Sequence, residues 1–170
     1  MIAIISDSHD NLANLEEFLK QAKQNKVETI LHCGDVTTPE FLSFLADNFS
    51  GQIKIAIGNA EIREEEFCFL AEENSRLEIF SEIGEMTLPL ADSRRLKVAF
   101  VHKPELAENL ANSGNYDYVF YGHTHQPWLV KDKKDVILAN PGTLGGVFSE
   151  PTYALLDPET GRLRLKKLFR

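Results

Sequence analysis

Polar residues that can bind metal ions follow five short apolar runs of this chain. In chain order these residues are Asp7 and His9, Asp35, Asn59, His102, and His123 with His125. The runs are rich in Ile, Val, Leu and Phe, which favours β-strands. In open α/β sheets, ligands bind beyond the carboxyl ends of the strands. We therefore expect a fold whose strand ends bring these side chains together.

The segment Tyr121–Gly122–His123–Thr124–His125 is the most informative of these strand ends. Residues i and i+2 of a β-strand point to the same face, so a strand that runs out into a loop here would aim both imidazoles at one place. Imidazole is the commonest protein ligand for metals. The alternative is a pair of surface histidines after an edge strand. The matching pair Asp7 and His9, together with the other strand ends, favours a metal site.

The first part of the chain predicts strands that alternate with helices. Strands are expected at 2–6, 29–32 and 53–57, and helices from 12 to about 22 and from 38 to about 47. Residues 61–76 are expected to form a short helix or a loop. The next predicted strands, 77–80, 85–90 and 96–101, have no helix between them, which favours hairpins with Ser93–Arg94 in a turn. A helix at 104–112 and strands at 118–121, 127–130, 135–139, 152–156 and 162–168 complete the prediction.

These elements predict an α/β (α+β) fold of one domain, residues 1–170, with two packed sheets and helices outside. The formal net charge of −8 disfavours nucleic acids and anionic membranes as partners. No apolar run approaches the roughly 18 residues that a membrane span needs. The N-terminus lacks a basic segment, so we expect no signal peptide. Cys33 and Cys68 form no CxxC pair, which fits a cytoplasmic protein.

The candidate ligands comprise two carboxylates, one amide and four imidazoles. They are too many for one ion and about right for two ions that share a bridging carboxylate. Nitrogen and oxygen ligands without thiolate suit Mn²⁺, Fe or Zn²⁺. Two such ions can hold a hydroxide and clamp a phosphate, which indicates phosphoester hydrolysis. The fifth histidine, His32, lies inside a predicted strand, and we expect it to be a core residue.

The motifs Asp7-x-His9, Gly34–Asp35, Gly58–Asn59, His102 and Gly122–His123-x-His125 resemble, in this order, those of the calcineurin-like metallophosphoesterases. Length, the opening SDSHDN and the closing NPGT are similar to the small prokaryotic, YfcE-like phosphodiesterase branch. The resemblance implies a four-layer αββα sandwich of two mixed sheets. It implies one metal ion on Asp7, His9 and His125, a second on Asn59, His102 and His123, and a bridging Asp35. It also implies that Asp35, Asn59 and His102 are catalytic and that Asn59 contacts the substrate.

Two positions depart from the family pattern. Ala60 stands where many relatives have a histidine that protonates the leaving group or binds phosphate, so poor leaving groups should be cleaved worst. Lys103 stands where relatives usually have glycine; it either contacts the substrate phosphate or turns outward. Glu61 keeps an acidic residue of the motif, as a support for the ligands or as an ordinary surface or capping carboxylate.

We expect a phosphodiesterase that hydrolyses small phosphodiesters through attack of a metal-bridging hydroxide. Its cofactors would be two divalent ions, Mn²⁺ first, with Ni²⁺, Fe, Zn²⁺ or Mg²⁺ as alternatives. One other interpretation is a non-catalytic scaffold, because the same branch includes the retromer subunit with this fold. Another is a phosphomonoesterase, for which Lys103 and Arg63 are the available cations. A homodimer or homotetramer is an open expectation.

Overall fold

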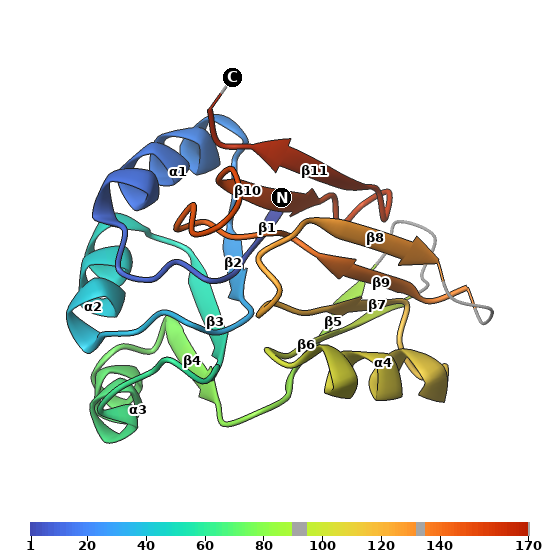
Figure 1. Cartoon of the computed structure of the whole chain (residues 1–170), viewed down its shortest axis with the longest axis horizontal. Helices are drawn as coiled ribbons and strands as arrows, with labels where there is room; N and C mark the ends of the chain where they lie inside the picture. Colours follow the sequence, from blue (N-terminus) through green and yellow to red (C-terminus); the bar gives the residue numbers. More distant parts are fainter. Residues whose placement is uncertain (90–94, 132–134, 170) are drawn as a thin grey trace.

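The computed structural model describes residues 1–89, 95–131 and 135–169. Two β-sheets pack face to face, and helices cover both outer faces (Figure 1). Three helices, α1 (Leu12–Gln24), α2 (Pro39–Asn48) and α3 (Glu64–Glu73), lie against the first sheet, and α4 (Pro104–Ser113) lies against the second. The expected four-layer αββα sandwich is confirmed. None of these helices has the length and apolar composition needed to cross a bilayer.

The first sheet has six strands in the order β11-β10-β1-β2-β3-β4. Their bounds are β1 Ile2–Ile5, β2 Thr29–His32, β3 Gln52–Ala56, β4 Leu77–Phe80, β10 Thr152–Leu156 and β11 Leu163–Lys167. Strands β1 to β4 are parallel, whereas β10 and β11 pair antiparallel. The carboxyl ends of the parallel strands therefore lie at one edge of this sheet.

The second sheet has five strands in the order β5-β6-β7-β9-β8. Their bounds are β5 Gly84–Pro89, β6 Arg95–Phe100, β7 Tyr118–Phe120, β8 Trp128–Lys131 and β9 Ile137–Asn140. Strands β6, β7 and β9 run parallel, and β5 and β8 pair antiparallel at the two edges. Both sheets are thus mixed, as expected.

The prediction of antiparallel pairing for 77–101 is only partly right. Strands β5 and β6 form the expected antiparallel pair, but β4 joins the first sheet parallel to β3. The physical reason is the charged segment 61–76, which contains α3 and so provides the long crossover that a parallel connection needs. The predicted turn at Ser93–Arg94 lies outside the described residues.

Local signals set the ends of the helices. The Asn11 side chain caps α1 by accepting a hydrogen bond from the backbone of Asn14, and Thr38 caps α2 in the same way. Proline occupies the first turn of both α2 and α4, where its missing N–H is not needed. Gly114 ends α4 in the left-handed conformation, with φ of 70°, as is common where a helix stops. The loops that lead to α1 and α2 carry the candidate ligands Asp7, His9 and Asp35.

Three apolar layers hold the sandwich together. One lies between the first sheet and its helices, one between the two sheets, and one between the second sheet and α4. In the first layer, Phe18 of α1 is fully buried and meets the ring of Tyr153 edge-on, with centroids 5.3 Å apart. This contact joins α1 to β10.

Replacing this ring tests the first layer. Phe18→Ala should lower the free energy of unfolding by about 3–5 kcal/mol, because the cavity sits in close-packed surroundings. Urea denaturation measures the change. The matched control is Phe69→Ala on α3, where the side chain is 61% exposed. The cost of this surface substitution should stay within about 0.5 kcal/mol. Equal losses in the two variants would contradict this packing.

Candidate metal centre

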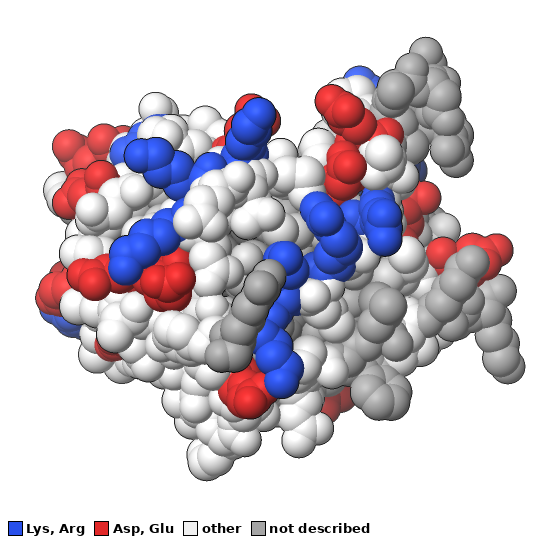
Figure 2. Space-filling view, turned by 90° about the horizontal axis from the view of Figure 1, so that it is seen from above, with Lys and Arg blue, Asp and Glu red and all other residues white. Residues whose placement is uncertain are grey.

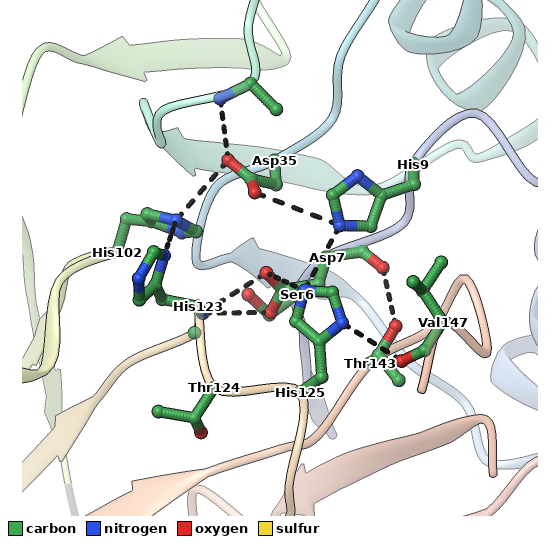
Figure 3. Close-up of polar contacts among 12 residues, drawn as sticks. Ser6, Asp7, His9, Asp35, His102, His123, Thr124, His125, Thr143 and Val147 are labelled. Carbon is green, nitrogen blue, oxygen red and sulfur yellow. Dashed lines mark hydrogen bonds and ion pairs between the residues drawn. The ribbon is translucent and has the colours of Figure 1, made fainter. Parts of the chain in front are cut away.

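All seven candidate ligands lie just beyond the carboxyl ends of strands. Asp7 and His9 follow β1, Asp35 follows β2, and Asn59 follows β3, all in the first sheet. His102 follows β6, and His123 and His125 follow β7, in the second sheet. Because the two sheets pack face to face, these loops meet at one edge of the sandwich. Figure 3 shows the imidazoles and carboxylates pointing toward one another.

One group of ligands consists of Asp7, His9, Asp35 and His125. One ligand atom from each of these residues lies within 4.8 Å of those of the other three. The Nε2 atoms of His9 and His125 are 3.2 Å apart. The Nε2 of His125 also lies 3.3 Å from Asp7 Oδ1. Two nitrogens and two carboxylates thus surround one point.

A second group consists of Asn59, His102 and His123. The Oδ1 of Asn59 lies 2.7 Å from His102 Nε2 and 2.9 Å from His123 Nδ1. The two ring nitrogens are 3.2 Å apart. One oxygen and two imidazole nitrogens therefore converge here as well.

Asp35 lies between the two groups. Its Oδ2 is 3.8 Å from His9 Nε2, and its Oδ1 is 3.4 Å from His102 Nε2 (Figure 3). The same Oδ1 accepts hydrogen bonds from the backbone N–H groups of Asn59 and Ala60, both at 2.9 Å. The carboxylate therefore presents one oxygen to each group, in an orientation fixed by the loop after β3.

His123 and His125 lie in a loop and not in the extended strand from which their common direction was predicted. Strand β7 ends at Phe120, and His123 and His125 have φ of 69° and 60°, so neither residue is in an extended strand. Their side chains enter different groups, His123 beside His102 and His125 beside His9. The expectation that both imidazoles aim at one place is therefore wrong. The loop's left-handed backbone directs each ring to its own group.

Left-handed backbone is a general property of this site. Asp7, His9 and Asp35 also have positive φ, at 51°, 43° and 60°. Such conformations cost non-glycine residues about 1–3 kcal/mol each and persist where the surroundings enforce them. Backbone hydrogen bonds do so here, from Asp7 N to Gly34 O at 3.0 Å and from His9 N to Asp35 O at 3.1 Å.

Two glycines allow the loops to approach each other closely. A Cβ on Gly122 would lie 2.0 Å from Ser6 Oγ, and one on Gly58 would lie 2.3 Å from Asp35 Oδ1. No other residue fits at either position without moving a ligand or its support.

Partners outside the groups orient the ligands. His102 Nδ1 lies 2.9 Å from the Cys33 carbonyl and His125 Nδ1 lies 3.0 Å from the Val147 carbonyl. These contacts leave both Nε2 atoms free for a metal. Glu61 accepts from the backbone of Val36 at 3.0 Å and of Gly58 at 2.9 Å, so it ties the loops after β2 and β3 together. This matches the supporting role considered from sequence.

Other supports were not recognised from the sequence. Thr143 donates its hydroxyl to the Asp7 carbonyl at 2.8 Å, and the backbone N–H of Gly145 donates to the same carbonyl at 3.0 Å. The NPGT segment, which contains Thr143, was recognised only as a motif shared with the family and not as a support for Asp7. His32 is fully buried, as expected for a core residue, and its Nε2 lies 3.0 Å from the Ser8 hydroxyl.

The electrostatics of the groups favour a bound cation. The pKa of Asp7 is raised to about 7, chiefly by burial and in part by the nearby charge of Asp35. Burial lowers the pKa of both His9 and His102, so these rings favour the neutral form that binds metals. Two buried carboxylates beside neutral imidazoles need a compensating positive charge. This donor set fits divalent metal ions.

The two positions that depart from the family pattern lie at the rim. Ala60 offers only its backbone N–H, to Asp35. Lys103 is exposed and is the N-cap residue of α4, and it lines a small hollow with Gly58 and His102. Its contact with a substrate stays a prediction.

Comparisons with known proteins define the class. The family model of the calcineurin-like phosphoesterase superfamily domain matches residues 1–161. Phosphodiesterase MJ0936 of Methanocaldococcus jannaschii is 30% identical over 164 residues, which cover 96% of each chain. A solved archaeal phosphodiesterase superposes with a TM-score of 0.83 at 29% identity and covers 98% of each chain. YfcE, a phosphoesterase from E. coli, has a TM-score of 0.67 at 19% identity over 99% of this chain and 93% of its own, which shows the fold.

The chain belongs to the calcineurin-like phosphoesterase superfamily, as its motifs predicted, and is a metal-dependent phosphoesterase. The family implies divalent metal ions, and the convergent groups described above provide the donors for them.

Metal loading should stabilise the fold. Adding Mn²⁺ to chelator-treated protein should raise the free energy of unfolding by ~2.7 kcal/mol at a free concentration about a hundredfold above Kd, because only the folded chain assembles the site. Thermal unfolding with Mn²⁺ and with chelator measures the shift. The control is Asp47→Asn, an exposed position on α2, which should keep the full shift. Identical transitions with and without metal would contradict the site.

Proposed function

We propose that this protein hydrolyses phosphodiesters at a pair of divalent metal ions. The observation that carries the proposal is the position of Asp35, whose two carboxylate oxygens face two separate groups of ligands. A single buried carboxylate in that position can join two ions. The similarity to phosphodiesterase MJ0936 over nearly the whole chain supports the diester as the substrate class.

The proposed ligand sets follow the two groups. Asp7, His9 and His125 would hold one ion, Asn59, His102 and His123 would hold the other, and Asp35 would bridge them. Nitrogen and oxygen donors of this kind suit Mn²⁺, Fe and Zn²⁺. We propose Mn²⁺ as the first choice, with Ni²⁺, Fe, Zn²⁺ and Mg²⁺ as alternatives. When bound, the ions supply an activated water and neutralise negative charge on the phosphate.

The protein's own residues would position the reaction. Asp35, Asn59 and His102 form the centre of the proposed catalytic set because they lie where the two groups meet. With a metal ion on Oδ1 of Asn59, the amide nitrogen would be available to donate a hydrogen bond to a phosphate oxygen. Lys103 at the rim is a second proposed substrate contact.

The site lacks a side chain at position 60 that could protonate a leaving group. The methyl group of Ala60 has no exchangeable proton, so an alkoxide must leave unaided or take a proton from water. We therefore expect the rate to depend steeply on the acidity of the leaving alcohol.

The charge around the site favours a diester over a monoester. A monoester carries a second negative charge, which calls for extra cations. The guanidinium of Arg63 is engaged in ion pairs with Glu40 and with Glu66, so it is a poor candidate for this role. Lys103 remains as the one cation that the motif itself provides.

Long nucleic acids are disfavoured as substrates by the net charge of −8. Figure 2 shows Lys and Arg side chains crossing one face of the molecule with Asp and Glu side chains beside them. Ion pairs such as Lys20–Glu17 and Lys167–Glu150 join exposed charges of opposite sign. We therefore propose a small phosphodiester and not a long nucleic acid as the substrate.

We also propose that residues 1–170 form one domain, which is supported by the continuous apolar layer between the two sheets. A cytoplasmic location and a homodimer or homotetramer stay predictions.

The scaffold alternative is disfavoured by the complete set of seven ligands, since a scaffold has no need of them.

Changing the bridging carboxylate tests the catalytic role. Asp35→Asn should lower kcat for diester hydrolysis at least about a hundredfold, because it removes the shared negative charge. The amide oxygen can still accept from the backbone of Asn59 and Ala60, so the fold should persist, as circular dichroism would show. Asp47→Asn makes the same chemical change at an exposed position and should leave kcat unaltered. Unchanged turnover by the Asp35 variant would refute the assignment.

The substrate class can be tested with one pair of esters. Chelator-treated protein reloaded with Mn²⁺ should hydrolyse bis-p-nitrophenyl phosphate faster than p-nitrophenyl phosphate, with kcat/KM higher by about tenfold or more. The good leaving group makes few demands on a general acid, so absorbance of p-nitrophenolate reports on the metal centre alone. A preference for the monoester would favour a phosphomonoesterase. Two bound metals without turnover of either ester would favour a binding role.

A further inference from the structure

Phe148 is an exposed aromatic side chain beside the metal centre. It is 95% exposed, the highest value among the exposed large hydrophobic residues that the structure describes. Its ring lies next to that of His125, with centroids 5.7 Å apart and planes 31° from parallel. The Nε2 of His125 points into the first ligand group, so Phe148 stands one imidazole ring away from the proposed metal position.

The backbone of Phe148 has an unfavourable conformation, which costs conformational energy. Its φ is 62°, in the left-handed region that non-glycine residues rarely adopt. The side chain recovers little of that cost by burial, since almost all of its surface faces water. Backbone strain of this kind clusters at functional sites, and here it occurs beside a candidate metal ligand, which indicates a role outside the stability of the monomer.

The loop that carries Phe148 is firmly attached to the site. Val147 O accepts from His125 Nδ1 at 3.0 Å, directly before Phe148. A few residues earlier, Gly145 O accepts from the Asn11 side chain at 2.9 Å, and Leu144 O accepts from the Asn14 side chain at 2.8 Å. Hydrogen bonds therefore hold the backbone that leads to Phe148, so the position from which the ring projects is fixed.

We infer that Phe148 is a stacking platform for a planar aromatic group attached to the phosphate of the substrate. This inference rests on the proposed function, because the phosphate must be held at the metals for its ester group to reach the ring. The Phe148 ring lies beside that of His125 and is almost fully exposed, so it is open to a ligand. Aromatic rings bind nucleobases and aryl groups through stacking and apolar contact. The preferred substrates are therefore diesters with an aryl or nucleobase group on one side.

Paired phosphonates test the platform without turnover. Phenylphosphonate and methylphosphonate share the anionic group and differ in the ring, and neither is hydrolysed. Calorimetric titration of the Mn²⁺-loaded protein should show phenylphosphonate binding roughly tenfold tighter. Phe148→Ala should abolish that difference and leave the affinity for methylphosphonate unchanged. Phe148→Trp should retain it, and Phe148→Leu should lose most of it.

The matched control is Phe69→Ala, which removes another exposed phenylalanine, 61% exposed on α3 and outside the ligand loops. This variant should keep the difference between the phosphonates. Adenosine 5′-monophosphate against ribose 5-phosphate forms a second pair. If this pair responds to Phe148→Ala as the phosphonates do, the platform accepts a nucleobase; if only the phosphonates respond, it is limited to smaller aryl groups.

Several results would overturn the platform. In the wild-type protein, these are equal affinity for the two phosphonates or binding of neither. In Phe148→Ala, they are an affinity difference that persists or an equal loss of affinity for both phosphonates. Light scattering gives one further outcome. If Phe148→Ala keeps the affinity difference between the phosphonates but converts a wild-type oligomer to monomer, Phe148 is a contact between copies of the chain. A ring-dependent difference in a protein that hydrolyses no diester would leave the platform standing and refute the proposed function.

Discussion

The Asp35 carboxylate connects the two halves of the site. It is only 3% exposed, and its Oδ1 accepts two backbone N–H groups from the loop after β3 while its own carbonyl accepts the N–H of His9. The loops after β1, β2 and β3 are thereby joined at one residue. A buried carboxylate is costly without a compensating positive charge. This arrangement therefore favours bound cations, and the imidazoles on either side are placed to bind the same cations.

The site is strained, and the sandwich around it supplies the stability. Five ligand residues have left-handed backbone, including Asp7 and His123, and loops approach so closely at Gly122 that a methyl group would not fit. The three apolar layers contribute no ligand, yet they hold the strand ends where those loops must meet. Rigid placement of this kind lets metals bind without reorganising the protein, which is how metal sites gain affinity and catalytic geometry.

The sequence predicted most elements because their signals are local. Apolar runs such as Ile2–Ile5, the cap at Thr38 and the proline at 104 act within a few residues, and the structure places strands and helices there. The position of β4 could not be predicted in the same way. Leu77–Phe80 has the composition of a strand in either sheet, and only the crossover through α3 puts it parallel to β3. Pairing of strands is decided by contacts distant in sequence.

The sequence by itself determined which residues could bind metals, since residue type and order along the chain carry that chemistry. It also determined the family, through spaced motifs that no single segment defines. The resemblance also implied how those residues divide between two ions, but only the tertiary structure decided how the loop after β7 turns the His123 and His125 rings to different sides. The tertiary structure alone brought Phe148 beside His125. The physical reason is that side-chain direction beyond a strand end depends on left-handed loop backbone and on hydrogen bonds from other loops, neither of which a local pattern specifies.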